Sequence, residues 1–443
     1  MIPSLRVLIY MNPLVVDKIS KKFIYEKDSG FLYTKQLLSE LPSNWRYVIL
    51  VPKDTKREFF PANRIIELID YDYSTSIHQN RYHFNRNIIT KSLPYSVDID
   101  LIINNQPEVS ANLRVVFENQ KREKPIIFSF YHWIDCEASC KFSKELSGFF
   151  WRQYDGALNS DISFFHSTYA LSLFTKEIDK NIKNPAEIKV GYFKPQPTIF
   201  GTNPVELPDK KIILFNHRCN ETTGWKDVLN ACKKLWTERD DFVLWLTDDA
   251  NLTNRKEIEA IDFVIQKRLD FKDYGFLIKN SHFAVCNTKG YATWNMAAMD
   301  AHANGCLCLL PDDNRCMYKG MFNNGFYHNG KNLYEIMNKA LNSTKAELNM
   351  INQSVSLKVP ENSMTNIILN TIQNKLKDEN PKKMDDVIAF IKSQNLTEKK
   401  EWVNKFWSFH ANSNFQKIRW KMLFGNYNLT DDTTKEYSTY KIN

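Results

Sequence analysis

The strongest constraint on the fold is a regular alternation between short apolar runs and longer segments of helical pattern. Each apolar run is too short for a helix of ordinary length and ends at polar or turn-forming residues. Such runs are typical of a parallel sheet covered by helices on both sides, because both faces of each strand are then buried. In the N-terminal half, strands are predicted within 6–11, 47–52, 100–105, 125–133, 162–167 and 188–193.

A proline-rich segment divides this pattern into two series. The segment 194–211 contains four prolines and one glycine, a composition typical of a linker. After it the alternation begins again, with strands predicted within 211–216, 242–247, 263–269, 281–287 and 306–311. The predicted fold class is therefore α/β, with two Rossmann-like parallel-sheet domains facing a central cleft. We expect an N-terminal domain of 1–197, a C-terminal domain of 205–380, and a helical C-terminal extension of 381–443 that packs back on the N-terminal domain.

Composition excludes several classes of protein. The 443 residues include eight cysteines, several of them inside apolar runs, so we expect buried free thiols in a reducing cytoplasm and no disulfide framework. No apolar run reaches the ~18 residues that a membrane span needs, and no membrane partner is expected. The net charge of +8 permits a polyanionic partner without requiring one. The 13 glycines form neither G-x-G-x-x-G nor G-x-x-x-x-G-K-[ST], so any phosphate must be held without a glycine-rich loop.

Two cations lie where such a phosphate could bind. In the segment 213–236 a strand, a polar loop and an amphipathic helix follow one another, with Arg218 in the loop and Lys226 in the first helical turn. A cation in the first turn opposes the helix dipole unless an anion is bound there. Together with the free N–H groups of the helix start, the two side chains suit a diphosphate. The alternative is a pair of solvated surface charges, with Thr222 and Thr223 as capping residues.

The segment 289–313 places an acidic residue in a second helix. This helix is predicted to begin near Thr293, which can cap it, and Asp300 then lies mid-helix among small and apolar neighbours. Burial of a carboxylate there is costly unless the carboxylate has a partner. Asp300 could accept hydrogen bonds from two ribose hydroxyls, with the helix start at 293–297 directed at the phosphates. The alternative is an aspartate half-exposed at a helix edge.

These two segments together resemble the C-terminal domain of retaining glycosyltransferases of the GT-B fold. In that family an Arg and a Lys hold the diphosphate of a nucleotide sugar, and an acidic residue followed five positions later by Gly holds the ribose. The resemblance implies these roles for Arg218, Lys226 and Asp300. The chain departs from the family in having Asp in place of Glu, and in lacking both the first Glu of the motif and its glycine-rich turn. The residues expected to bind the donor at that turn and helix start are Thr293, Trp294, Asn295 and Met296.

A narrower resemblance is to the DNA α-glucosyltransferases of T-even phages, which glycosylate 5-hydroxymethylcytosine. It rests on N-H-R and T-T-G-W-K within 216–226, on 162–174 and 190–197, and on M-D-A-H-A-N-G at 299–305. His132, at the end of a predicted strand, matches a His of that family near the reacting sugar. Trp133 stands at the position of the family's Asp, and Asp135 follows two residues later. His132 and Asp135 are therefore catalytic candidates, with a structural histidine as the alternative and the role of Asp135 open.

This resemblance implies transfer of glucose, or of a pentose such as arabinose, from UDP-glucose or UDP-arabinose to 5-hydroxymethylcytosine in double-stranded phage DNA. The transfer is expected to retain the anomeric configuration without requiring a metal, and the target base must be flipped out of the duplex. The enzyme is expected to act as a monomer in the cytoplasm of the infected bacterium. Two alternatives stay open: a GT-B enzyme acting on a cell-surface saccharide or a modified tRNA base, and a non-catalytic protein that binds a nucleotide sugar or DNA.

A basic N-terminal face with aromatic side chains would assist binding to DNA. Such cations matter because contacts to phosphates supply most of the affinity for a duplex. Ordinary surface charge and packing are the alternative for each residue taken singly. The candidates are Lys21, Lys22, Arg81, Arg86, Arg122, Tyr73, Tyr82 and Phe84.

Overall fold

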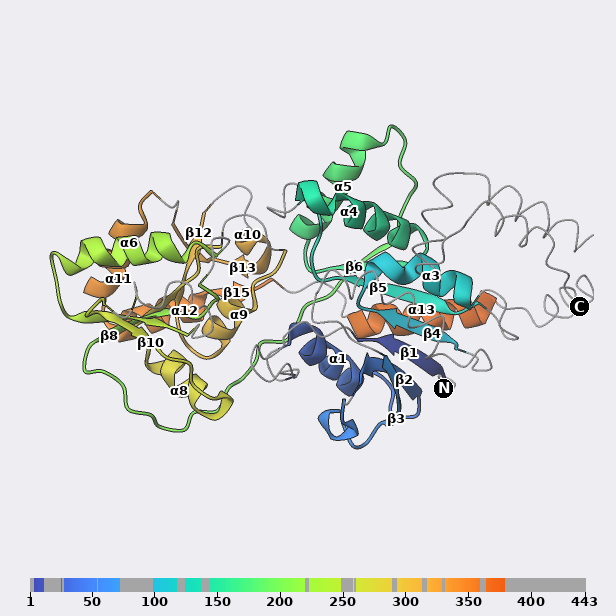
Figure 1. The fold of residues 1–443 in the computed structure, drawn as a ribbon, viewed down its shortest axis with the longest axis horizontal. Helices are drawn as coiled ribbons and strands as arrows, with labels where there is room; N and C mark the ends of the chain where they lie inside the picture. Colours follow the sequence, from blue (N-terminus) through green and yellow to red (C-terminus); the bar gives the residue numbers. More distant parts are fainter. Residues whose placement is uncertain are drawn as a thin grey trace, which may run out of the picture.

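The structure of the chain, a computed structural model, contains two α/β units that lie side by side along the long axis of the molecule (Figure 1). Each unit is built around one parallel sheet. The residues described are 4–11, 25, 28–53, 55–71, 99–117, 124–136, 143–219, 223–247, 258, 260–288, 293–312, 317–328, 331–358 and 364–378.

The N-terminal unit is a seven-stranded sheet of order β3-β2-β1-β4-β5-β6-β7 in which neighbouring strands are parallel. Its strands are β1 (Arg6–Tyr10), β2 (Arg46–Pro52), β3 (Ile65–Tyr71), β4 (Leu101–Asn104), β5 (Ile126–Tyr131), β6 (Ile162–Phe165) and β7 (Val190–Tyr192). The helical segments are α1 (Ser29–Glu40), η2 (Arg57–Phe59), η4 (Pro107–Val109), α3 (Ser110–Val116), α4 (Ser143–Leu158) and α5 (Thr168–Asn181). All six strands predicted for this half are confirmed. The structure adds β3, an edge strand in which Glu67 and Asp70 interrupt the apolar run.

Helices cover both faces of this sheet, which explains why its central strands are apolar along most of their length. In β1, Val7 and Ile9 pack in the core that contains α1, whereas Leu8 and Tyr10 pack in the core that contains α3. All four side chains are fully buried. A third cluster joins the ends of β5 and β6 to α4 and α5 on the same side as α3 (Figure 1). The sheet therefore has the doubly covered architecture that the sequence predicts.

The C-terminal unit is a six-stranded parallel sheet of order β10-β9-β8-β11-β12-β14. Its strands are β8 (Lys211–Phe215), β9 (Phe242–Leu246), β10 (Val264–Gln266), β11 (Phe283–Val285), β12 (Cys308–Pro311) and β14 (Phe326–His328), and β13 (Phe322–Asn323) pairs with β15 (Ser356–Leu357) in a separate antiparallel ladder. The helices are α6 (Trp225–Trp236), α8 (Phe271–Asn280), α9 (Met296–Ala303), α10 (Tyr318–Met321), α11 (Leu333–Asn342) and α12 (Lys345–Ser354). The five strands predicted here are confirmed. The three short strands that follow α10 lie in a region for which the apolar-run pattern predicts none.

The last described helix, α13 (Met364–Asp378), leaves the C-terminal unit and packs on the N-terminal sheet beside α1 (Figure 1). Ile368 and Ile372 are buried in the same core as α1, and the Thr365 hydroxyl donates to Glu40 at 2.7 Å. We expected 205–380 to form one domain, but α13 belongs by its packing to the N-terminal core. The predicted extension 381–443 lies outside the described residues.

The first part of the linker is fixed by polar contacts with both units. Gln196 donates its backbone N–H to the Gln36 side chain of α1 at 2.8 Å. Two residues later, the backbone N–H of Thr198 donates to Asp300 of α9 at 2.7 Å, and Asn304 contacts Thr198 and Phe200. The linker thus connects α1 of the first unit directly to α9 of the second.

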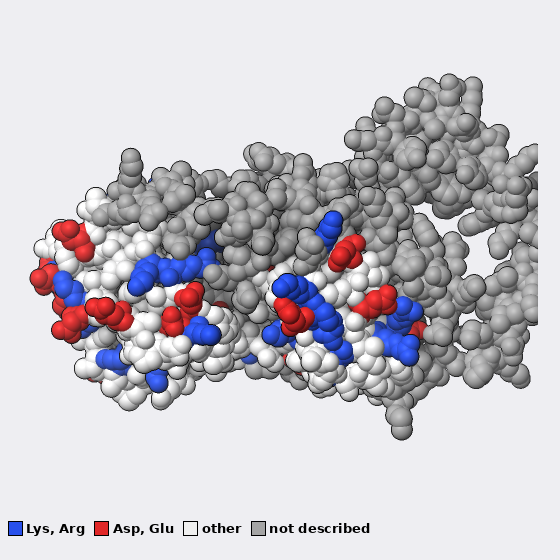
Figure 2. All heavy atoms as spheres, turned by 60° about the horizontal axis from the view of Figure 1, so that its bottom comes forward, with Lys and Arg blue, Asp and Glu red and all other residues white. Residues whose placement is uncertain are grey.

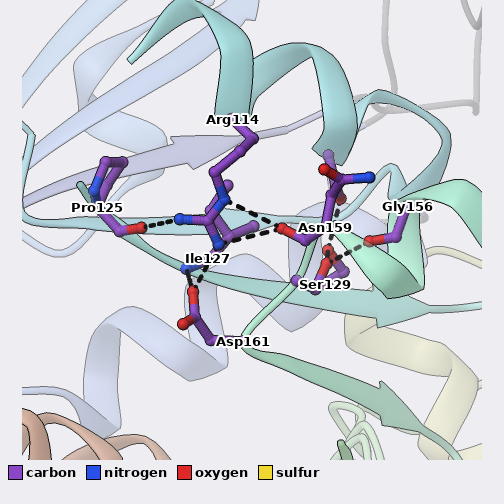
Figure 3. A network of polar contacts seen from close by, with 9 residues as sticks. Arg114, Pro125, Ile127, Ser129, Gly156, Asn159 and Asp161 are labelled. Carbon is purple, nitrogen blue, oxygen red and sulfur yellow. Dashed lines mark hydrogen bonds and ion pairs between the residues drawn. The ribbon is translucent and has the colours of Figure 1, made fainter. Parts of the chain in front are cut away.

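A polar network at the edge where β5 and β6 begin joins α3 to the starts of these two strands (Figure 3). The guanidinium of Arg114 donates to Pro125 O at 2.7 Å and to Asn159 O at 3.1 Å, and it pairs with Asp161 at 2.7 Å. Asp161 in turn accepts from the backbone N–H of Ile127 at 2.8 Å. These residues precede or begin β5 and β6, so the network lies at the opposite edge of the sheet from the carboxyl ends of the strands. Among the described helices, none has the length and apolar character needed to cross a bilayer.

Candidate functional site

The C-terminal sheet has its topological switch point between β8 and β11. From β8 the chain proceeds to β9 and β10 on one side, and β11, β12 and β14 lie on the other. Ligands of open parallel sheets bind at such a point, outside the carboxyl ends of the strands. The segments that follow β8 and β11 are those that carry the predicted donor-binding residues.

Arg218 and Lys226 both lie just beyond β8, and both side chains are exposed. Lys226 is the second residue of α6, so its predicted place in the first helical turn is confirmed. Neither side chain makes an ion pair with any described residue. The Thr223 hydroxyl donates to Arg218 O at 2.6 Å and closes the loop before the helix. Two cations that pair with no described acidic residue therefore flank a helix N-terminus, which is a favourable position for an anion.

Gly224 allows this loop to approach the end of β11. It is the N-cap of α6 and has a φ of 66°, in the left-handed region. A Cβ at this position would lie 2.4 Å from Asn287 O and 2.5 Å from Asn287 Nδ2. Asn287 Nδ2 donates to Gly224 O at 3.0 Å and to Asp227 at 3.2 Å. Asn287 was not predicted as a site residue; its only sequence signal is a polar side chain two residues after a buried strand.

The start of α9 lies beside the same segment. Asn295 caps this helix by accepting from the backbone N–H of Ala298 at 3.0 Å, and it donates to Thr288 at 3.2 Å and to Tyr318 at 2.6 Å. The expected helix start near Thr293 is wrong: α9 begins at Met296, with Asn295 as its cap. Asn can both cap and bridge neighbouring loops because its amide has an acceptor and a donor end.

Thr293 and Trp294 instead make contacts with the first unit. The buried Thr293 hydroxyl donates to His132 O at 2.9 Å. The Trp294 ring stacks on His166, with ring centroids 5.3 Å apart and an interplanar angle of 19°. The Nε1 atom of Trp294 and the Nδ1 atom of His166 are both buried without a hydrogen-bond partner in the part of the chain that the structure describes. The predicted turn and the end of the first sheet are therefore in direct contact.

Asp300 lies in the middle of α9, as predicted, and it faces the linker. Its Oδ1 atom accepts from the backbone N–H of Thr198 at 2.7 Å. Burial raises the pKa of Asp300 to about 7, although the hydrogen bond from Thr198 opposes this shift. The phenol of Tyr274 also lies close, and burial and the Asp300 charge both raise its pKa. If Asp300 binds the ribose, as the sequence predicts, its carboxylate would accept from the ribose hydroxyls in addition to the Thr198 N–H.

In the N-terminal unit, His132 follows β5 and its half-buried ring contacts aromatic rings from three other elements. Tyr33 of α1, His166 after β6 and Phe193 after β7 have ring centroids 5.2, 5.7 and 5.4 Å from that of His132. Burial lowers the pKa of His132 to about 4 and that of His166 well below its usual range. Both imidazoles are therefore neutral at pH 7. His132 Nε2 also lies 3.2 Å from Asn105 Oδ1, a contact with a residue that was not predicted.

Asp135 is directed into α4. Its backbone N–H donates to Gln153 Oε1 at 3.1 Å, and Gln153 Nε2 donates to the Asp135 carboxylate at 3.1 Å. The same amide donates to the buried Glu108 at 3.0 Å. These contacts fix Asp135 within a buried network at the ends of β4 and β5. No group of three or more His, Cys, Asp or Glu side chains suited to a metal ion occurs among the residues described.

The N-terminal residues predicted to form a basic, aromatic DNA-binding face all lie outside the described part of the chain. They are Lys21, Lys22, Arg81, Arg86, Arg122, Tyr73, Tyr82 and Phe84. On the face seen in Figure 2, the Lys and Arg side chains of the described residues are interspersed with Asp and Glu. That part of the surface has a mixed charge.

Comparison with known proteins identifies the fold. No protein-family model and no curated protein matches the sequence. Among solved structures, the chain is similar to an α,α-trehalose-phosphate synthase of Burkholderia xenovorans in complex with glucose-6-phosphate, with a TM-score of 0.55 and 11% identity over 79% of this chain and 94% of that chain. It is also similar to a sucrose-phosphate synthase of Thermosynechococcus elongatus, with a TM-score of 0.57 and 13% identity over 79% and 92%.

A third similar structure is described as a UDP-N-acetylglucosamine 2-epimerase of Listeria monocytogenes, with a TM-score of 0.51 and 13% identity over 85% of this chain and 98% of that chain. The synthases have the GT-B fold, with two Rossmann-like domains, so the predicted fold class is confirmed. The epimerase illustrates that similar architectures serve more than one reaction, and function must be argued from the site.

Proposed function

We propose that this protein is a glycosyltransferase that transfers a sugar from a UDP-sugar to a hydroxyl acceptor. The observation that carries this proposal is the pair of exposed cations, Arg218 and Lys226, at the start of α6 beside the switch point of the second sheet. Cations at this position suit a leaving group that gains negative charge as the glycosidic bond breaks. A purely structural role would not require two charges that have no ionic partner among the described residues at a helix N-terminus, where the dipole disfavours them.

The donor would lie between the starts of α6 and α9. Arg218 offers a planar fork to phosphate oxygens, and Lys226 offers a point charge. Asp300 would accept from ribose hydroxyls on the linker side of α9. The choice of a UDP-sugar is supported by structural neighbours, one of which is a trehalose-6-phosphate protein of Escherichia coli bound with UDP-2-fluoro glucose.

During transfer, the bond between the sugar C1 and the diphosphate oxygen breaks, and a bond forms between C1 and the acceptor oxygen. The proton of the acceptor hydroxyl passes to the departing phosphate, so a strong protein base is not needed for a reaction that retains configuration. His132, which is neutral at pH 7, would orient a hydroxyl of the sugar or acceptor at the contact between the two units. Asp135 has a positioning role in this scheme, because its contacts run to Gln153.

For the acceptor, we propose 5-hydroxymethylcytosine in phage DNA. The support is the similarity of 216–226, 162–174, 190–197 and 299–305 to the DNA α-glucosyltransferases of T-even phages. A duplex base would have to be flipped out of the stack to reach the donor. Glucose and arabinose are both compatible with the residues named, and the protein would act as a monomer in the cytoplasm of an infected bacterium.

Transfer assays test the donor and the acceptor separately. The full chain is incubated with labelled UDP-glucose or UDP-arabinose and with hydroxymethylated duplex DNA, unmodified duplex DNA or glucose-6-phosphate. We expect label only in hydroxymethylated DNA. Transfer to glucose-6-phosphate alone would replace the DNA acceptor with a small sugar phosphate, whereas no binding of UDP or of either UDP-sugar would refute the enzyme assignment. The same assays on Lys226→Ala test the role of the cation in the first turn of α6. Lys233→Ala, which removes a cation from the last turn of the same helix, is the matched control.

A further inference from the structure

Asn105 makes three polar contacts at the end of β4, and one of them is with His132. The side chain is 7% exposed. Its Nδ2 atom donates to Tyr10 O at 3.1 Å and to Thr34 Oγ1 at 3.3 Å. Its Oδ1 atom lies 3.2 Å from His132 Nε2. The amide therefore joins β1, α1 and the residue that follows β5.

The first two contacts fix which way the Asn105 amide faces. The carbonyl of Tyr10 can only accept a hydrogen bond, so it must face the NH2 group of the amide. The Thr34 hydroxyl uses its hydrogen on Gly30 O at 2.8 Å, and its lone pairs are therefore available to accept from the same NH2 group. Both neighbours require the same orientation, and this leaves the amide oxygen directed at His132.

The orientation of the amide then determines the tautomer of His132. An amide oxygen has no hydrogen to give, so His132 Nε2 must carry the hydrogen in this contact. Among the described residues, the titratable groups whose rings face His132 are Tyr33 from α1 and His166 after β6, and both are neutral at pH 7. A neutral imidazole has a single N–H, and Nδ1 is then an acceptor. Unlike Nδ1 of His166, the Nδ1 atom of His132 is not among the buried unpartnered atoms of the described residues, and the His132 side chain is only half-buried.

We propose that Asn105 is a positioning residue that holds His132 in the Nε2–H tautomer, so that Nδ1 accepts a hydrogen bond from a substrate hydroxyl. The tautomer follows from the contacts of Asn105, and only the identity of the hydroxyl rests on the proposed function. His132 would then accept from a hydroxyl of the transferred sugar or of the acceptor. Thr34 supports this arrangement from α1 by holding the amide in place.

The tautomer is measured on the full chain without any substrate. The protein is labelled with 15N in histidine only, the His132 signals are assigned from their loss in His132→Gln, and the coupling pattern of the two ring nitrogens is recorded at pH 7. We expect a protonated Nε2 and an unprotonated Nδ1. A protonated Nδ1 would overturn the proposal even if every Asn105 variant failed to fold.

Two substitutions test whether Asn105 acts through His132. Asn105→Asp replaces the amide oxygen with a charged one, so it should raise the pKa of His132 and move the acid limb of the rate profile to higher pH. Asn105→Ala removes the acceptor without adding charge; it should lower kcat about tenfold and leave the acid limb in place. Thr34→Val removes only the supporting contact and should change kcat less than Asn105→Ala.

The outcomes separate this inference from the proposed function. An unchanged His132 titration in Asn105→Asp refutes the link between the two residues, whatever the activity. If the wild-type chain transfers no sugar while His132 is in the Nε2–H form and responds to Asn105→Asp, the proposed function fails and the positioning of His132 by Asn105 stands.

Discussion

Gly224→Ala is the substitution for which the structure allows the sharpest prediction. The new Cβ would lie 2.4 Å from Asn287 O, at least 0.6 Å inside the 3.0 Å limit for real contacts (3.0 minus 2.4). An alanine at a φ of 66° costs about 1–2 kcal/mol. Displacing a packed backbone atom adds about 1–3 kcal/mol. The total is therefore about 2–5 kcal/mol, and the start of α6 must move away from the end of β11.

Gly305→Ala is a matched control for this experiment. Gly305 also has a positive φ, 84°, but a Cβ there meets nothing within 4 Å. In this variant only the positive φ of the alanine lowers the free energy of unfolding, by about 1–2 kcal/mol. The difference between the two variants thus isolates the contact with Asn287.

The free energy of unfolding is measured by urea titration, and the affinity for UDP by calorimetry on the folded variants. We expect Gly224→Ala to be the less stable by about 1–3 kcal/mol and to bind UDP more weakly, with Gly305→Ala close to wild type in UDP affinity. Equal stability and equal UDP affinity in the two variants would refute the argument that Gly224 is required for the approach of α6 to Asn287.

Three further predictions concern other parts of the molecule. Arg218→Ala and Lys226→Ala should each lower turnover about 100-fold while Lys233→Ala stays near wild type, and unchanged rates in both would remove the diphosphate site. The pKa of Asp300 is raised to about 7 from ~3.9 in an unfolded chain, so the native state binds more protons between these values. The free energy of unfolding should therefore fall as pH rises from about 4 to 7, and Asp300→Asn should flatten this part of the urea-derived profile. Arg114→Met should destabilise the N-terminal unit by about 2 kcal/mol without weakening UDP binding, because its network lies at the opposite edge of the sheet; a loss of UDP affinity would contradict this.

The sequence was most informative where a property repeats along the chain. Strands buried on both faces must be apolar at consecutive positions, and all eleven predicted strands are present. β3 was not predicted because it is an edge strand, and charged residues such as Glu67 interrupt its apolar run. The placement of Lys226 in a first helical turn was also predictable, since the polar loop and the amphipathic period locate the helix start.

The start of α9 was predicted less well, for a local reason. Thr293 and Asn295 are both good capping residues, and the sequence does not say which one caps. In the fold, the Thr293 hydroxyl donates to His132 O, whereas Asn295 donates to Tyr318 and caps the helix. The helix therefore begins three residues later than expected.

The sequence by itself determined the two-sheet architecture and the exposed cations at the start of α6, because both depend on periodicity and on near neighbours. Only the tertiary structure decided which distant groups meet: Asn105 with His132 across 27 residues, and His132 with Thr293 across 161. A hydrogen bond requires two atoms about 3 Å apart in a defined orientation, and residue type alone specifies neither. Burial likewise set the pKa values of His132 and Asp300, because the loss of solvent depends on the residues that pack around each group.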